Sequence, residues 1–148
     1  MRQVELHAPI TPHFDWSDAL WLHDWGRPAT EEDGLTDEIL HNLMDLFQRM
    51  ELVREFFGKP INIHCAYRPQ KYNRAIGGAE NSAHMAMGKE AAADFNVLGI
   101  TCDNARSLIL ACDKLTAWEM RMERREGSDW IHLDTRIPAP GHNRYFAP

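Results

Sequence analysis

Residues 130–134 read Trp-Ile-His-Leu-Asp, so apolar and polar side chains alternate along this stretch. Successive side chains of a β-strand point to opposite faces of a sheet, and this alternation therefore predicts a strand with one buried face. Residues 92–97, Ala-Ala-Asp-Phe-Asn-Val, predict a second strand on which Asp94 points away from the core. We expect His132 and Asp134 to lie on the polar face of their own strand, so that the candidate functional side chains share one face of the sheet.

Two imidazoles and one carboxylate, those of His84, His132 and Asp94, belong to these strands and to a third segment of the chain. A zinc ion that performs chemistry typically takes three protein ligands and leaves its fourth position to water, whereas a structural site uses four. The sequence therefore predicts an open zinc site made of these three side chains.

The composition is that of a folded protein. Of the 148 residues, 44% are hydrophobic and 26% charged, which is typical of a chain that buries one core. We expect one domain over residues 1–148, because no repeat, low-complexity tract or long linker interrupts the sequence. The formal net charge is −6 and no basic run is longer than Arg124-Arg125, so nucleic acid is not expected as a partner.

The N-terminal sequence and the cysteines bear on the compartment. The chain does not open on an apolar stretch of seven or more residues, so neither a signal peptide nor a membrane span is predicted. Three cysteines without a CxxC pair indicate reduced thiols. We expect a protein that is cytoplasmic as synthesised, with release to the cell wall as a further step if it is phage-encoded.

The apolar pattern predicts an α+β fold with a small, mostly antiparallel sheet and helices packed on one of its faces. A long helix is expected from Thr36, its N-cap, to Phe57, with Gly58 at its end, because apolar residues recur at spacings of three and four. The other expected elements are a helix at 17–24, a strand at 61–65, a helix from 69 to 77, a helix from 101 or 103 to 110, and a half-exposed strand at 118–123.

Several short motifs occur in an order that points to one known family. In chain order they are Tyr67-Arg68, Ser82-Ala83-His84, Gly88, Ala92-Ala93-Asp94 and His132-Leu133-Asp134. Over about residues 61–136 the chain resembles the zinc D-Ala-D-Ala carboxypeptidase family, peptidase family M15. The resemblance implies a Hedgehog/D,D-peptidase type fold, one Zn²⁺ and hydrolysis of peptide bonds in peptidoglycan stem peptides or their precursors. Relatives include phage endolysins that cut between L-alanine and D-glutamate, and cytoplasmic dipeptidases.

The chain departs from the family pattern at the carboxylate ligand. The resemblance implies that His84 and His132 are the imidazole ligands and places an aspartate seven residues after the first of them. Asp94 follows His84 by ten residues. Asp94 keeps the Ala-Ala-Asp-Phe strand context, and we expect it to be the ligand, with the additional residues in a loop. Glu90, six residues after His84, is the alternative.

Hydrolysis also needs a base that takes a proton from the attacking water. The family keeps an acidic residue three positions before its last histidine, and here this position holds Asp129. Glu126, at the tip of the same turn, is the alternative. For both residues the competing interpretation is a solvated charge on the turn.

The resemblance also implies a set of substrate-binding residues. Arg68 matches the arginine that contacts the substrate and its developing oxyanion, a role that suits a permanently charged guanidinium. Tyr67 and Ser82 belong to the same motifs and are expected to contact the substrate. Asp134 is expected to hydrogen-bond the second nitrogen of the His132 ring. His64 is a further side chain that can reach the site face of the sheet.

The sequence therefore predicts a zinc metallopeptidase whose partner is a peptidoglycan peptide, with no nucleic-acid or membrane partner. The D-Ala-D-Ala and L-Ala-D-Glu bonds, carboxypeptidase and endopeptidase action, and the oligomeric state remain open at this stage. The alternative is a non-catalytic module of the same fold that binds a muropeptide or a protein. The presence of a base, Asp129 or Glu126, distinguishes the two, because a binding module has no use for one.

Overall fold

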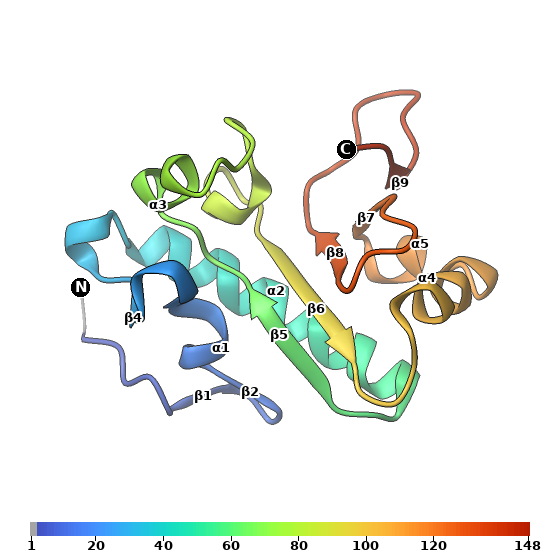
Figure 1. Cartoon of the computed structure of the whole chain (residues 1–148), viewed down its shortest axis with the longest axis horizontal. Coiled ribbons are helices and arrows are strands. Elements are labelled where there is room, and N and C mark those ends of the chain that lie inside the picture. The colour runs from blue at the N-terminus through green and yellow to red at the C-terminus, as the bar shows by residue number, and fades with distance from the viewer. Residues whose placement is uncertain (1–2) are drawn as a thin grey trace.

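A five-stranded sheet organises the protein in its computed structural model, which describes residues 3–148 (Figure 1). In spatial order the strands are β5 (Ile61–Cys65), β6 (Ala92–Val97), β8 (Ile131–Asp134), β7 (Arg121–Glu123) and β9 (Tyr145–Phe146). The first four are paired antiparallel, and β9 runs parallel to β7. The α+β class and the small, mostly antiparallel sheet are thereby confirmed.

The register between the central strands places the polar residues of both on one face. Asp94 of β6 is opposite His132 of β8, while Ala93 is opposite Leu133. Directly opposed residues of an antiparallel pair point to the same side of the sheet. Because Ala93 and Leu133 belong to the hydrophobic core, the alternation in the sequence forces Asp94 and His132 to the other face.

The long helix α2 (Asp37–Phe57) packs against β6 and lies behind β5 and β6 in the view of Figure 1. The hydroxyl of Thr36 accepts a hydrogen bond from the N–H of Ile39, which satisfies one of the free donors of the first turn. At the other end Gly58 takes a left-handed conformation with φ of 60°. The stripe of α2 that is buried against the sheet consists of Ile39, Leu43, Leu46, Phe47, Met50 and Val53. Both predicted ends of this helix, and its apolar face, are confirmed.

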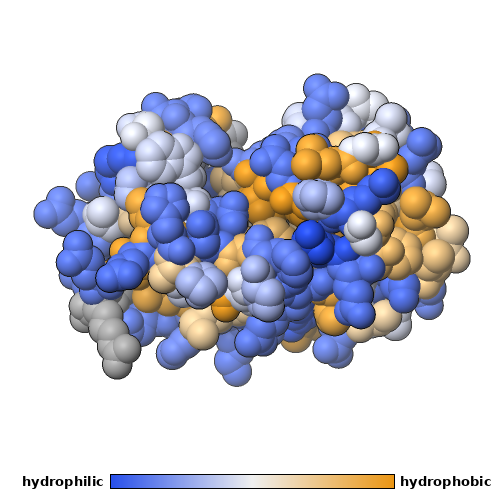
Figure 2. All heavy atoms as spheres, turned by 90° about the horizontal axis from the view of Figure 1, so that it is seen from below, coloured by the Kyte–Doolittle hydropathy of each residue, from blue (hydrophilic) through white to orange (hydrophobic). Residues whose placement is uncertain are grey.

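Shorter elements complete the described part of the chain. They are β1 (Pro9–Thr11), β2 (Phe14–Asp15), α1 (Trp16–Leu20), β3 (Trp21–Leu22), β4 (Arg27–Pro28), α3 (Gln70–Ala75), α4 (Cys102–Ala111) and α5 (Lys114–Trp118), with 3₁₀ turns η1 (His23–Trp25), η2 (Glu31–Asp33) and η3 (Ala83–Met85). Hydrophilic residues cover much of the face shown in Figure 2, and hydrophobic ones gather mostly at the centre and right of the view. None of the helices within residues 3–148 has the length and hydrophobicity of a membrane span.

Two predicted elements are wrong in part. The helix expected at 17–24 ends at Leu20, because the chain reverses at Gly26, whose φ is 61°, and pairs β3 with β4. The strand expected at 118–123 begins only at Arg121. Trp118 instead ends α5, and the chain leaves that helix through Glu119 in a left-handed conformation with φ of 54°.

The C-terminal segment adds a strand that the sequence did not predict. After β8 the chain loops out and returns as β9, where Met122 donates its N–H to the carbonyl of Arg144 and Arg124 donates to that of Phe146, both at 2.7 Å. The guanidinium of Arg121 lies over the ring of Phe146, 3.9 Å from its centre. This packing brings the end of the chain to the polar face of the sheet.

Candidate metal centre

His84 is presented by the short turn η3, which follows the loop that contains Ser82. The hydroxyl of Ser82 accepts a hydrogen bond from the N–H of His84 and so begins the turn. On the imidazole, Nδ1 lies 2.7 Å from the carbonyl oxygen of Ala66 and donates to it. Nδ1 thus carries a proton, and Nε2 faces Asp94, whose Oδ1 is 3.2 Å away.

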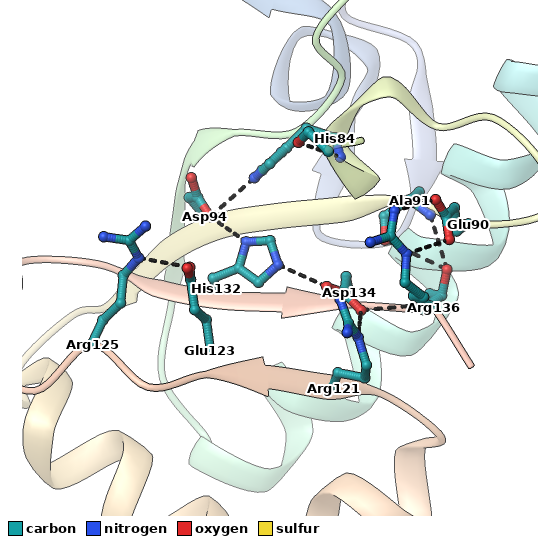
Figure 3. A network of polar contacts seen from close by, with 12 residues as sticks. His84, Glu90, Ala91, Asp94, Arg121, Glu123, Arg125, His132, Asp134 and Arg136 are labelled. Atoms are coloured by element: carbon teal, nitrogen blue, oxygen red, sulfur yellow. Dashed lines mark hydrogen bonds and ion pairs between the residues drawn. The ribbon is translucent and has the colours of Figure 1, made fainter. Parts of the chain in front are cut away.

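His132 is oriented in the same way by a carboxylate (Figure 3). Its Nε2 lies 2.8 Å from Oδ2 of Asp134 and its Nδ1 lies 2.9 Å from Oδ1 of Asp94. Asp134 is fully buried and accepts two hydrogen bonds of 2.8 Å from Arg121. This pairing keeps Asp134 ionised, so it accepts a hydrogen bond from Nε2–H and turns Nδ1 toward Asp94, where a metal ion would bind. The predicted contact between Asp134 and His132 is confirmed.

The three predicted metal ligands come together. One donor atom from each of His84, Asp94 and His132 lies within 4.8 Å of the others, and all three residues are buried. Two imidazole lone pairs and a carboxylate oxygen that converge in this way match the donor set of an open zinc site. The second nitrogen of each ring is already bonded to an acceptor, so the donor atoms are positioned before any ion arrives.

Without a metal ion this group forms a charged cluster. Burial alone lowers the pKa of His84, but the charge and the hydrogen bond of Asp94 outweigh it and raise the pKa to about 10. Burial alone would raise the pKa of Asp94, but the two histidines lower it by more. The pKa is therefore below its ordinary value, and the carboxyl stays ionised. The free protein therefore carries a proton at the position that a metal ion must take.

Zinc binding is expected to release protons and to become tighter as pH rises. A metal ion binds only the deprotonated imidazole, and His84, with a pKa of about 10, is protonated throughout the neutral range. Calorimetric titration with zinc in two buffers of different ionisation enthalpy measures the release directly. A binding heat that does not depend on the buffer, together with an affinity that does not change with pH, would contradict this expectation.

The metal-binding group lies in the wall of a cavity of about 440 Å³. Arg68 and Ser82, two of the residues predicted to bind substrate, also line this cavity. Nη2 of Arg68 lies 3.3 Å from Oδ2 of Asp94. Tyr67 does not line it: its side chain is buried, faces a different hollow beside α2, and has a pKa that burial raises to about 12. The Tyr-Arg dipeptide thus directs only its arginine toward the metal-binding group.

Neither residue predicted as the base lines the cavity. Asp129 is exposed and lines a separate hollow that includes Thr101 and Cys102 at the start of α4. Glu126 is exposed and accepts a hydrogen bond of 2.9 Å from the hydroxyl of Tyr145. The acidic residue that does line the cavity, besides the metal-binding group and Asp134, is Glu123 of β7. The alternation at residues 118–123 predicted a half-exposed strand, whereas the side chain of Glu123 is only 11% exposed.

Glu90, the alternative carboxylate ligand, and His64, which was expected to be able to reach the site face, do not belong to the metal-binding group. Glu90 forms two hydrogen bonds of 2.7 and 2.6 Å with Arg136, which hold its carboxylate in the loop after His84. Nε2 of His64 lies 2.6 Å from the side-chain oxygen of Asn96. The additional residues between His84 and Asp94 are thus accommodated in a loop that an ion pair closes.

Asp94→Ala is expected to lower zinc affinity severely, whereas Glu90→Ala is expected to leave it nearly unchanged. Asp94 supplies one of the three converging donor atoms, while Glu90 is engaged by Arg136. Competition titration with a chromogenic chelator measures both affinities. The reverse order of the two effects would place the carboxylate ligand in the loop.

The fold and the site together define a class of protein: a small α+β chain that holds two imidazoles and a carboxylate beside a substrate-sized cavity. The family model described as Peptidase M15 matches residues 25–134, well over half of the chain. The protein therefore belongs to the peptidase M15 family, as its motifs predicted, and is a metal-dependent peptidase by family. No curated protein and no solved structure shows a significant match.

Proposed function

We propose that this protein is a zinc metallopeptidase of the Hedgehog/D,D-peptidase type that hydrolyses peptide bonds of peptidoglycan stem peptides or their precursors. The observation that carries the proposal is the buried group of His84, Asp94 and His132 in the wall of the cavity, with the second nitrogen of each ring bonded to an acceptor. The target is a bond of the D-Ala-D-Ala or the L-Ala-D-Glu kind. Family membership supports this substrate class.

The chemistry divides between the ion and the side chains around it. A zinc ion held by His84, Asp94 and His132 supplies Lewis-acid activation of water and of the scissile carbonyl. Arg68 extends into the same cavity and donates hydrogen bonds to the oxygen on which negative charge develops. Its position beside Asp94 is maintained by the ion pair at 3.3 Å, and the charge of a guanidinium does not depend on pH in the working range.

We assign the proton transfer to Asp129, on the turn that leads into β8. Its place three residues before His132 matches the family motif, and it takes a proton from the attacking water and delivers it to the leaving amine. Its side chain lines a neighbouring hollow in the free protein. Contacts of a catalytic base are often long before substrate binds and shorten in the complex. Glu126 and Glu123 are the competing carboxylates.

Mass spectrometry of purified muropeptides incubated with the zinc-loaded protein tests the proposal. We expect two new products, the carboxyl and amine fragments of one hydrolysed bond, whose masses identify the bond that is cut, and no product after treatment with a chelator. The same peptides incubated with His132→Ala serve as the matched control. If the zinc-loaded protein binds these peptides but cleaves none of them, the protein is a binding module of the same fold; the position of Asp129 and Glu126 outside the cavity is the observation that favours this second function.

A further inference from the structure

The cavity beside the metal-binding group is rich in arginine, although the chain as a whole is acidic. Among residues 3–148, four arginines and three side-chain carboxylates line it: Arg68, Arg121, Arg125, Arg136, Asp94, Glu123 and Asp134. These charges sum to a small positive value in a protein of formal net charge −6, and a bound zinc ion would add two more. The cavity therefore favours a ligand that carries negative charge.

Three of the four arginines each bind a carboxylate of the protein through one terminal nitrogen, Nη2, and two of them also through Nε. Arg121 binds Asp134 through Nε and Nη2. Arg136 binds Glu90 through the same pair of atoms. Arg68 binds Asp94 through Nη2. Arg121 and Arg68 thus support the metal-binding group, and Arg136 supports the loop after His84.

Arg125 differs from these three. Only its Nε is engaged, in a hydrogen bond of 2.6 Å to Glu123, and within residues 3–148 neither of its terminal nitrogens has a partner. Figure 3 shows both terminal nitrogens turned away from Glu123. The stem of the side chain is held in place, because its guanidinium also lies over the ring of Trp130, 5.1 Å from the centre. At 36% its side chain is the most exposed of the four.

A positioned guanidinium with both terminal nitrogens free is suited to bind a carboxylate through two parallel hydrogen bonds. The two candidate bonds of the proposed substrate share such a group. In D-Ala-D-Ala the residue on the amine side of the bond ends in a free α-carboxylate. In L-Ala-D-Glu the glutamate continues the chain through its γ-carboxyl, so its α-carboxylate is free in the same place. An ordinary peptide has an uncharged amide there.

We propose that Arg125 is a specificity-determining residue that binds the free α-carboxylate on the amine side of the scissile bond, with Glu123 as the residue that positions it. This inference rests on the proposed peptidase function. It explains how one cavity accepts either wall-peptide bond and rejects an ordinary peptide bond, whose amide leaves the guanidinium unpaired.

Two pairs of substrates test the inference on the zinc-loaded protein. One pair is acetyl-Lys-D-Ala-D-Ala and its C-terminal amide; the other is L-Ala-γ-D-Glu-Lys and its counterpart with an α-carboxamide on the glutamate. The pair that is cleaved identifies the source of the carboxylate. For that pair we expect kcat/KM to favour the carboxylate about 10- to 100-fold, the range set by a charge-assisted pair of hydrogen bonds.

Arg125→Gln should remove this preference by lowering kcat/KM for the carboxylate, mainly through KM, while the amide is cleaved within about 3-fold of the parent rate. Arg124→Gln is the matched control, because Arg124 packs on Tyr145 and does not line the cavity. Arg124→Gln should keep the full preference. Arg125→Lys, which retains a charge without the paired donors, should keep part of it.

Zinc content and thermal unfolding are measured for each variant, and if Arg125→Gln does not fold, the comparison is made with Arg125→Lys. A preference that survives unchanged in the Arg125 variant, or equal losses on both members of the pair, overturns the inference. Equal cleavage of carboxylate and amide by the parent overturns it as well and leaves the proposed function intact. A zinc-loaded parent that cleaves no substrate overturns the proposed function, and the inference with it.

Discussion

His84→Ala and His132→Ala are each expected to reduce bound zinc from about one ion per chain to almost none and to abolish hydrolysis. Each imidazole supplies one of three donor atoms that lie within 4.8 Å of one another. Replacement of a residue that only supports a ligand typically costs about 10- to 100-fold in metal affinity, so loss of a ligand itself should cost more. Elemental analysis of the purified variants and chelator competition measure the effect.

His64→Ala is the matched control for these two variants. His64 lies on β5, next to the strand that carries Asp94, but its ring is bonded to Asn96 and does not belong to the metal-binding group. Zinc content should stay at the parent level when His64 is replaced. Full zinc occupancy in both His84→Ala and His132→Ala would show that the ligand assignment is wrong.

Asp129→Asn is expected to lower turnover of a wall peptide about 10²- to 10⁴-fold, the usual contribution of a general base. The amide keeps the shape of the side chain and loses the basic oxygen, so zinc content and fold should be unchanged. Binding of the same peptide should change far less, because Arg68 and the metal-binding group are untouched. Steady-state kinetics and a separate binding titration distinguish the two effects.

Two further carboxylate-to-amide variants identify the base if Asp129→Asn cleaves at the parent rate. Glu126→Gln removes the competitor on the same turn, and Glu123→Gln removes the one that lines the cavity. As the residue that positions Arg125, Glu123 should affect KM for carboxylate substrates much more than kcat. A loss of 10²-fold or more in kcat that is confined to Glu123→Gln, with Asp129→Asn unaffected, would transfer the role of the base to Glu123.

Much of the site was predictable because it depends on sequence patterns within single strands and helices. A period of two in residues 92–97 and 130–134 determines which side chains of each strand point to the core. A period of three and four in residues 37–57 determines which face of α2 is buried. Because the apolar faces of β6 and β8 pack into the same core, Asp94, His132 and Asp134 lie together on the opposite face.

Other features of the site depend on contacts between residues that are distant in the sequence. Nothing near Glu123 or Arg125 indicates that they line the cavity; this follows from the antiparallel pairing of β7 with β8, in which Arg121 is opposite Asp134. Phe146 reaches the cavity only because β9 returns to pair with β7.

The two central strands, the long helix and the three side chains that can hold a metal ion were thus predictable from the sequence, because periodicity and family motifs act within single segments. Which carboxylate each arginine of the cavity binds, and that the terminal nitrogens of Arg125 have no partner in the described part of the chain, follow only from the tertiary structure. The tertiary structure also decided that Tyr67 and Asp129 line other hollows. The physical reason is that the partner of a charged side chain depends on strand register and on the path of distant loops, and no short-range pattern specifies either.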